Sequence, residues 1–258
     1  MRIVTWNCQG GFRHKAAKIE ALKPDLAIIQ ECEAPERLQA TGSDWSQRVL
    51  CWHGDNPRGK GVAVIAFSNF QLAIDPIHDP SIKHVVPVLV SGDHGFNLLA
   101  VWTKEDVEKK AMYIGQAWAG VKQYAPFIEA RPTVVIGDFN SNQLWDRPNR
   151  HLHADVVATL ESHGLVSVYH PWYREHQGAE TRNTFYMYRK RERGFHIDYC
   201  FIPRNWLPHV HSVQVGAHGT WSRLSDHCPL VVDIEFDRPA TNPGQRILDW
   251  RDQLVNNT

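Results

Sequence analysis

The sequence is short of three things, and each shortage excludes a class of protein. Its longest uninterrupted apolar run, residues 62–67, falls far below the roughly 20 residues that a membrane-spanning helix needs, so we expect no membrane segment. Five cysteines with no Cys-x-x-Cys pair do not make a disulfide framework and fit a reducing compartment. The 28 basic residues equal the 28 acidic ones, which argues against a polybasic DNA-binding protein but is compatible with a locally basic groove.

The N-terminus also lacks the pattern of a secretion signal. An apolar pattern begins at Ile3, with no charged stretch before it and no long apolar segment after it. Together with the sparse cysteines, this predicts a cytoplasmic protein. Nothing in the sequence implies a protein partner, and we expect a monomer.

What the sequence does contain is an alternation of short apolar runs with helical stretches. Its 258 residues, 43% of them hydrophobic, suffice for one large domain with a sizeable core. Amphipathic spacing or composition predicts helices at residues 14–22, 105–127 and 155–163. Strands are predicted at residues 2–8, 26–30, 62–67, 85–90, 97–102, 133–136, 166–169, 184–188, 196–202, 211–215 and 228–236.

This order of elements predicts an α/β fold in which two sheets pack together with helices outside. Each strand-rich half is interrupted by only one or two helices, which does not fit a doubly wound parallel sheet. No repeat, low-complexity tract or long linker divides the chain, so we predict one catalytic domain over residues 1–236. Residues 237–258 form a peripheral tail, in which the helical spacing of Ile247, Trp250 and Leu254 indicates a short docked helix.

Polar side chains stand at the ends of five apolar strands. Burying a charged or amide group costs several kcal/mol unless the group is paired or binds a metal. A single aspartate in such a place is most simply a strand cap or a turn residue, but five such places in one chain indicate a common polar site. The segments are TWNCQG with Asn7, IIQEC with Glu31, IGDFNS with Asp138 and Asn140, HIDYCF with Asp198, and LSDHCPL with Asp226 and His227.

In this order, the five segments resemble the endonuclease/exonuclease/phosphatase superfamily, which includes exonuclease III-like and apurinic endonucleases, deoxyribonuclease I-like enzymes and several lipid or inositol phosphatases. GDFN and SDHCPL carry the resemblance, the TF…G..HIDY arrangement at residues 184–199 adds to it, and the match runs from residue 2 to about residue 236. The resemblance implies a four-layer α/β/β/α sandwich of two mixed sheets with the site at one edge. It also implies metal-dependent hydrolysis of phosphoester bonds.

The resemblance and the chemistry of the side chains imply a metal site. Glu31 supplies a hard carboxylate oxygen of the kind that Mg²⁺ prefers, and Asn7 supplies a neutral oxygen beside it. Asp226 either ligates the metal, directly or through water, or only holds its loop, and the sequence does not separate these roles. We therefore expect Mg²⁺, or Mn²⁺ in its place, at Glu31, Asn7 and Asp226.

The residues that act on water and phosphate are implied in the same way. Asp138 resembles the family residue that orients or deprotonates the attacking water, and Asn140, two residues on, points the same way along an extended chain. His227 is suited to stabilise charge on the phosphoryl oxygens or to act as an acid or base. Asp198 resembles its orienting partner. The expected catalytic residues are Asp138, Asn140, Asp198 and His227.

The cysteines have a zinc or nucleophile interpretation and a simpler one. Cys8 and Cys32 directly follow proposed site residues, so their side chains would face the opposite way on a strand, into the core. Buried cysteine acting as a small apolar residue is the commoner case. We expect the same of Cys200 and Cys228.

Two further motifs also have simpler explanations. His151-x-His153-x-Asp155 matches part of a zinc motif of metallo-β-lactamase-type hydrolases, but Val156 stands where the next histidine should be. A helix N-terminus explains this segment better. The Gly-Lys-Gly at residues 59–61 could cradle a phosphate, but it lacks the P-loop spacing, and a turn before the next strand explains it better.

A basic stretch precedes Asp198 and is therefore expected at the rim of the site. Basic grooves with interleaved aromatic side chains bind nucleic acid by stacking the bases, whereas a run of charge is usually a solvated hairpin tip, and both interpretations stay open. The stretch contains Arg182, Arg189, Lys190, Arg191 and Arg193 among Tyr186, Tyr188 and Phe195. On the first interpretation, the substrate-binding residues are Arg189, Lys190, Arg191 and Arg193.

The function that these residues predict is Mg²⁺-dependent hydrolysis of DNA or RNA phosphodiester bonds by an activated water. The first alternative is a phosphatase or phosphodiesterase acting on a small soluble or lipid phosphoester, which the zero net charge favours. The second is a catalytically silent binding scaffold, which the complete set of site residues disfavours. Trp102-Thr103 occupies a strand end where many family members place a catalytic His or Asn, so no specific branch is assigned.

Overall fold

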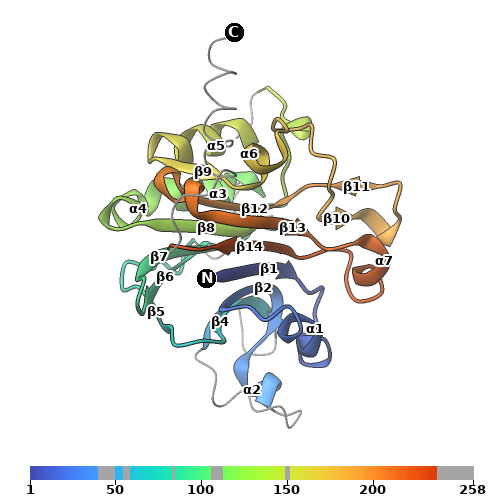
Figure 1. Cartoon of the computed structure of the whole chain (residues 1–258), viewed down its shortest axis with the longest axis horizontal. Coiled ribbons are helices and arrows are strands. Elements are labelled where there is room, and N and C mark those ends of the chain that lie inside the picture. Colours follow the sequence, from blue (N-terminus) through green and yellow to red (C-terminus); the bar gives the residue numbers. More distant parts are fainter. Residues whose placement is uncertain (40–49, 55–58, 83–84, 106–112, 149–151, 237–258) are drawn as a thin grey trace.

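Two six-stranded β-sheets lie face to face in the computed structural model, which describes residues 1–39, 50–54, 59–82, 85–105, 113–148 and 152–236 (Figure 1). The strand order of the first sheet is β13 (Val210–Val215), β14 (Leu230–Ile234), β1 (Arg2–Asn7), β2 (Leu26–Glu33), β4 (Lys60–Ala66) and β3 (Leu50–Gly54). The order of the second is β5 (Gln71–Ile74), β6 (Val85–Ser91), β7 (Phe96–Trp102), β8 (Thr133–Asp138), β12 (Asp198–Pro203) and β9 (Leu165–Ser167). Both sheets are mixed, because β1 runs parallel to β2 and β7 runs parallel to β8, while their other neighbours are antiparallel.

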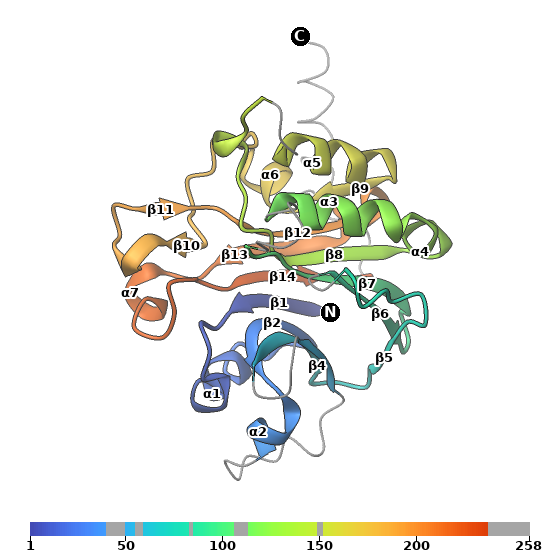
Figure 2. The same ribbon diagram turned by 180° about the vertical axis from the view of Figure 1, so that it is seen from behind.

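Helices cover the two outer faces of this pair of sheets (Figure 2). The first sheet carries α1 (Ala16–Glu20), α2 (Pro35–Gln39) and α7 (His218–Trp221), and the second carries α3 (Ile114–Gln123), α4 (Ala125–Ala130) and α5 (His153–Ser162). The short helix α6 (Tyr169–Tyr173) follows β9, and β10 (Phe185–Tyr186) pairs with β11 (Gly194–Phe195) in a small separate hairpin. Of the helices in the described ranges, none combines the length and the apolarity needed to cross a membrane.

The alternation of side chains along each strand produces the layers. In β1, Ile3 packs between the two sheets, whereas Val4 packs with Ile19 of α1 on the outer face. In β7, Leu98 packs between the sheets and Leu99 packs under α3, α4 and α5. The fold is therefore the predicted four-layer α/β/β/α sandwich of two mixed sheets.

The single helix predicted over residues 105–127 is wrong. From residue 113 onward, the structure has two helices, α3 and α4, which meet at Tyr124, where φ is −95° and ψ is 17°. Pro126 lies in the first turn of α4. A proline inside a continuous helix would remove a hydrogen bond and clash with the preceding turn, so the helix ends and a new one begins. Residues 106–112 of the prediction lie outside the described residues.

Several other boundaries differ from the prediction. The helix predicted at residues 14–22 is the short α1, preceded by a 3-10 turn at Phe12–His14. Tyr169, predicted to end a strand, begins α6 instead. The strand predicted at residues 184–188 ends at Tyr186, because Tyr188 and Arg189 have φ of 56° and 59°, which no strand accommodates.

Three strands, β3, β5 and the two-residue β11, were not predicted, and the helix predicted in the tail is not covered. β3 and β5 are the outermost strands of their sheets, and their side chains are partly exposed, so neither has the apolar run of a central strand. The helix predicted in the tail, residues 237–258, lies outside the described residues.

Candidate active site

The strand ends that carry the polar residues meet at one edge of the sandwich. Because β8 and β12 are antiparallel neighbours, Asp138 at the end of β8 stands opposite Asp198 at the start of β12. In the other sheet, β1 and β2 run parallel and place Asn7 near Glu31. Asn7 Nδ2 donates to Glu31 Oε1 at 3.2 Å and to Asp138 Oδ2 at 2.9 Å. Asn7 therefore connects the two sheets at this edge.

A loop tied to β1 positions His227. Ser225 Oγ donates to the Asn7 carbonyl oxygen at 2.7 Å and accepts from the His227 backbone N–H at 3.0 Å. Trp6 Nε1 donates to the His227 carbonyl oxygen at 2.9 Å. The Phe185 ring packs against the imidazole with 4.9 Å between the ring centroids. These contacts fix both the backbone and the ring plane of His227.

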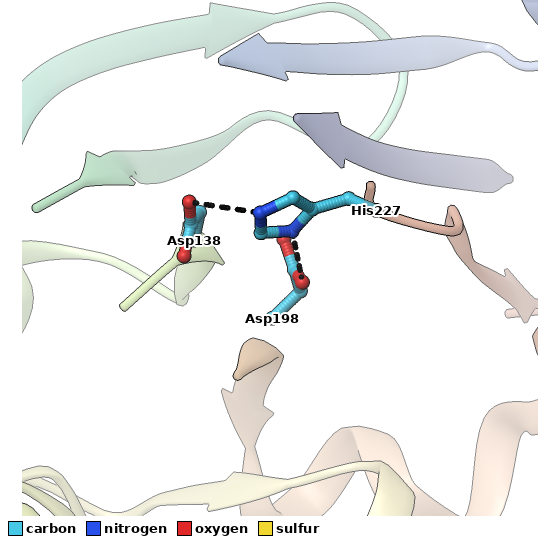
Figure 3. A group of neighbouring side chains, drawn as sticks. All are labelled: Asp138, Asp198 and His227. Atoms are coloured by element: carbon cyan, nitrogen blue, oxygen red, sulfur yellow. Dashed lines mark hydrogen bonds and ion pairs between the residues drawn. The ribbon is translucent and has the colours of Figure 1, made fainter. Parts of the chain in front are cut away.

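The centre of the site is an imidazole between two carboxylates (Figure 3). His227 Nδ1 lies 2.9 Å from Asp198 Oδ2, and Nε2 lies 3.8 Å from Asp138 Oδ2. All three side chains are buried. Burial by itself lowers the pKa of His227, but the charges of Asp198 and Asp138 outweigh it and raise this pKa to about 10. The ring is therefore an imidazolium at neutral pH.

Asp138 is the second perturbed group. Burial raises the pKa of its carboxyl to about 7, against the lowering effect of the His227 charge, and the Asp198 charge adds to the rise. Asn140 donates its backbone N–H to Asp138 Oδ1 at 2.8 Å and its Nδ2 to Oδ2 at 3.0 Å. A carboxyl group that titrates near neutral pH can accept a proton and release it again.

Asn140 has an unusual backbone, and Thr103 supports it. The φ of Asn140 is 45°, so the residue departs from the extended chain that the sequence predicted for it. Its Nδ2 also donates to the Thr103 carbonyl oxygen at 2.7 Å. Thr103, the residue after the end of β7, thus contributes a backbone carbonyl that holds Asn140 on Asp138.

A β-bulge turns Glu31 toward the site. The register between β2 and β4 shifts between Ile29 and Cys32, and Glu31 within that bulge has φ of 56°. Bulges re-aim side chains next to active sites, and a non-glycine residue with such a φ is strained unless its surroundings hold it. The Glu31 carboxylate is 22% exposed, and its Oε2 lies 2.5 Å from Lys60 Nζ.

Gln9 connects the metal-site candidates to the basic segment. Its backbone N–H donates to Asn7 Oδ1 at 3.0 Å, and its Nε2 donates to Asp226 Oδ2 at 2.8 Å. The guanidinium of Arg189 donates to Gln9 Oε1. The structure thus shows the loop-holding contact of Asp226, while its role as a ligand, and that of the Asn7 amide oxygen, stay predictions.

The buried trio of Asp138, Asp198 and His227 and the partly exposed Glu31 differ in whether they can bind a cation. The side-chain ligand atoms of Asp138, Asp198 and His227 lie within 4.8 Å of one another, but they already pair with one another, and an imidazolium has no lone pair to offer. Glu31, by contrast, already holds a cation, the Lys60 ammonium, on one carboxylate oxygen. An oxygen-preferring divalent ion therefore fits at Glu31 better than inside the buried trio.

The basic segment lies partly at the site and partly in solvent. Arg189 reaches Gln9, and its Nη1 donates to the Arg223 carbonyl oxygen at 3.4 Å. Arg193 lies over the ring of Tyr188, with 5.8 Å from Cζ to the ring centroid. Arg182 belongs elsewhere, because it pairs with Glu175 at 3.0 Å. Lys190 and Arg191 are exposed.

The remaining motifs have the structural roles that the sequence favoured. Burial raises the pKa of the Cys8 and Cys228 thiols to about 12, and Cys32 and Cys200 are also buried, so none of the four is a reactive thiolate. His153 begins α5 and is buried against Ser141 and Gln177, whereas His151 lies outside the described residues.

Three residues of the site were missed by the sequence analysis. Gln9 and Ser225 flank predicted site residues, so proximity in sequence was the available signal. Lys60 was noticed within the Gly-Lys-Gly at residues 59–61 but was assigned to a turn. It begins β4 and contacts Glu31, 29 residues away in the chain. Only the pairing of β2 with β4 reveals that contact.

The comparison with solved structures shows the same fold in DNA-processing proteins. The 3′ phosphatase NExo from Neisseria, bound to a product DNA hairpin, aligns with a TM-score of 0.67 and 20% identity over 92% of this chain and 100% of that one. The catalytic domain of APE2 from Xenopus laevis gives 0.67 and 14% over 94% of both chains. The AP endonuclease LMAP from Leishmania major gives 0.63 and 15% over 92% of this chain and 88% of that one.

The comparison by sequence assigns the family. No curated protein sequence matches the chain. The model of the Endonuclease/Exonuclease/phosphatase family matches residues 4–227, which contain every polar strand end described above. The chain therefore belongs to the endonuclease/exonuclease/phosphatase family.

Proposed function

We propose that the protein is a divalent-metal-dependent phosphodiesterase that hydrolyses DNA or RNA. The observation that carries this proposal is the chain Asp198–His227–Asp138 beside the partly exposed Glu31. It combines a charged hydrogen-bond donor, a carboxyl group that titrates near neutral pH and a carboxylate open to a cation. Such a set serves attack of water on a phosphoester.

Asp138 acts on the water and His227 acts on the phosphate. Asp138 orients the attacking water and accepts its proton as the new bond between oxygen and phosphorus forms and the bond to the leaving oxygen breaks. The His227 imidazolium, held by Asp198, donates its Nε2–H to a phosphoryl oxygen and stabilises the charge that develops there. The raised pKa of His227 favours this donor role over a role as base. Glu31 would hold a divalent ion, which would supply Lewis acidity to the same phosphoryl group.

The rim of the site favours nucleic acid as the substrate. Leu144, Trp145, Met187 and Tyr188 are exposed large apolar side chains, and Tyr188 is 74% exposed. They lie in the two segments that follow Asn140 and precede Asp198, and the rings of Trp145 and Phe195 contact each other with 4.9 Å between centroids. Exposed rings beside arginines suit stacking on bases along a charged backbone.

The remaining parts of the proposal are the ion, the compartment and the assembly. Mg²⁺, with Mn²⁺ as a substitute, is the ion that an oxygen-only ligand set at Glu31 suits. The five cysteines are all free, which supports a reducing cytoplasm. We propose a monomer whose partner is the nucleic acid itself.

A phosphomonoester at a DNA end is the second candidate substrate. The Neisseria structure is described as a 3′ phosphatase with product DNA, and it aligns over 92% of this chain. The same imidazolium and carboxyl pair would serve this substrate. It also fits the zero net charge, because a strand end requires fewer phosphate contacts than an internal site.

The test is a panel of substrates with matched variants. Purified protein with Mg²⁺ is incubated with plasmid, single-stranded DNA, RNA, an abasic duplex, a 3′-phosphorylated oligonucleotide and a soluble aryl phosphomonoester. Cleavage of one or more polynucleotides, lost in Asp138→Asn and His227→Ala but kept in the surface variant Lys18→Met, supports the proposal. Turnover of the aryl phosphomonoester alone would replace it with the small-phosphoester alternative, and no turnover at all would favour a scaffold.

A further inference from the structure

The Lys60 ammonium sits on the carboxylate that is proposed to bind the metal. Lys60 Nζ lies 2.5 Å from Glu31 Oε2, and the two side chains are 48% and 22% exposed. β2 and β4 are antiparallel neighbours in the sheet. The ion pair joins Lys60, the first residue of β4, to Glu31 in the bulge of β2. A divalent ion that binds Glu31 must therefore compete with a positive charge that the chain itself supplies.

The backbone leaves room for Lys60 to lie there. Gly10 has φ of 75°, and a Cβ atom at this position would stand 3.0 Å from Lys60 Cε. The lysine stem therefore lies across a residue that has no side chain. Beneath it, Lys15 Nζ donates to the carbonyl oxygens of Cys8 and Gly10 at 2.6 and 2.7 Å, which holds this turn in place.

The neighbouring Glu33 shows what a permanent ion pair looks like in this strand. Its two oxygens accept from the Phe12 backbone N–H at 2.7 Å and from Arg13 Nη1 at 2.5 Å, and the residue is buried. Glu31 instead pairs with a flexible, half-exposed lysine. An exposed Lys–carboxylate pair contributes little free energy and is screened by salt, so this pair can open without disturbing the fold.

We infer that Lys60 exchanges partners during the reaction cycle: it neutralises Glu31 in the metal-free protein, and when a divalent ion takes Glu31 it moves to a phosphate oxygen of the substrate. This inference rests on the proposed role of Glu31 as a metal ligand. The displaced ammonium stays anchored at the start of β4, so it remains next to the phosphate that the ion attracts. The exchange makes metal binding weak without substrate and supplies a phosphate contact once both are bound.

The first test measures metal binding without substrate or turnover. Calorimetric titration with Mn²⁺ alone is expected to show about threefold to tenfold tighter binding in Lys60→Met than in the unchanged protein, and the gap should narrow at high salt because the pair is exposed. Lys60→Arg keeps the charge and should bind Mn²⁺ like the unchanged protein. Lys18→Met removes an exposed lysine of α1 and is the matched control.

The outcomes separate the two proposals. Equal Mn²⁺ affinity in Lys60→Met and the unchanged protein, with a large loss in Glu31→Gln, would overturn the exchange and leave the metal site standing. Equal affinity in Glu31→Gln would overturn the metal site itself. With saturating Mn²⁺ and a phosphodiester substrate, Lys60→Met should raise KM severalfold and leave kcat nearly unchanged. An unchanged KM would overturn the transfer of Lys60 to the phosphate.

Discussion

At the scale of single residues, the main feature of the site is that three charged side chains are buried and stabilise one another. Asp198 and Asp138 are fully buried and would be costly as two free anions, but the imidazolium of His227 lies between them. Each carboxylate therefore needs the histidine, and the histidine keeps its proton because of them. Removing one member leaves the others unbalanced, so the three act as a unit.

The first prediction follows from that unit. His227→Ala should reduce turnover by roughly 10²–10⁴-fold, the usual scale for a positioned acid–base group. Asp198→Asn should cause much of the same loss, because the ring then lacks the carboxylate that orients it. The double variant should be little worse than His227→Ala, since residues that act as a unit are not additive. Steady-state kinetics of the four proteins test this, and fully multiplicative losses would show independent roles.

The second prediction concerns protons. The pKa of His227 is raised from 6.5 to about 10, so the stability that it contributes is fully present below pH 6.5 and is lost as the pH rises through 10. The raised pKa of Asp138 lowers stability as the pH rises from 3.8 to about 7, and this cost then stays constant. Buried thiols such as Cys8 add a further loss above their ordinary pKa of 9.0, so the range from pH 7 to 9.0 reports on His227. Thermal melts should fall across that range in metal-free protein.

Nuclear magnetic resonance of the histidine ring nitrogens gives the direct measurement. Asp198→Asn should move the pKa of His227 down toward 6.5, because the ring then loses the buried carboxylate that holds its proton. A His227 ring that titrates near 6.5 in the unchanged protein would contradict this account of the site.

At the scale of elements, the segment between β10 and β11 carries the basic residues that we propose for binding a nucleic-acid substrate. Its turn contains Tyr188 and Arg189 in the left-handed region, and Arg189 reaches back to Gln9. Lys190 and Arg191 are exposed, and Arg193 lies over the Tyr188 ring. The segment is anchored at its start, since the Tyr186 N–H donates to the Asp226 carbonyl oxygen at 2.7 Å. A substrate that lies along it therefore reaches the site loop directly.

The third prediction tests this segment. Changing Arg189, Lys190, Arg191 and Arg193 to serine should weaken binding of DNA or RNA at every sequence, and each lost phosphate contact should reduce the log–log salt slope by roughly 0.7–0.9. A minimal aryl phosphodiester should still be hydrolysed. The variant Lys122→Ser with Arg131→Ser, on the helical face of the second sheet, is the control. Unchanged affinity and slope would mean that the segment is only a solvated hairpin.

The elements also show where sequence reasoning succeeds. Central strands such as β1, β2 and β8 are continuous apolar runs that end in a polar residue, so local sequence predicts them and their site residues. The contact of Lys60 with Glu31 and that of Arg189 with Gln9 depend on which strands pair and on backbone angles with φ near 60°. Neither has a signal within a window of a few residues, and both were therefore missed.

At the scale of the whole molecule, the apolar core of the fold is formed by residues other than the proposed metal ligand Glu31. One apolar cluster fills the space between the sheets and two others lie under the outer helices, and Glu31 belongs to none of the three. The polar residues at the edge pair with one another through hydrogen bonds and ion pairs such as Asp198–His227 and Asn7–Asp138. We therefore expect the fold to persist when the metal is removed.

The fourth prediction is that removing metal abolishes activity without unfolding the protein. In excess chelator, turnover should vanish while the far-ultraviolet circular dichroism spectrum stays the same, and added Mg²⁺ should restore activity. The ion should stabilise only by mass action, about 2.7 kcal/mol at a concentration 100 times its dissociation constant. Full activity in chelator, or loss of the spectrum, would contradict it.

The pairing of β1 with β14 has a consequence for how the protein is made. β1 lies inside the first sheet with β14 on one side and β2 on the other, and the Trp6 side chain donates to His227, 221 residues later in the chain. During synthesis, the first strand must wait for the last described strand before its sheet is complete. A nascent chain therefore has no assembled site until residues 225–234 have left the ribosome. Contacts of such long sequence separation form slowly, so we expect the edge of β1 to be the point at which a growing chain is most open to chaperones or to misfolding.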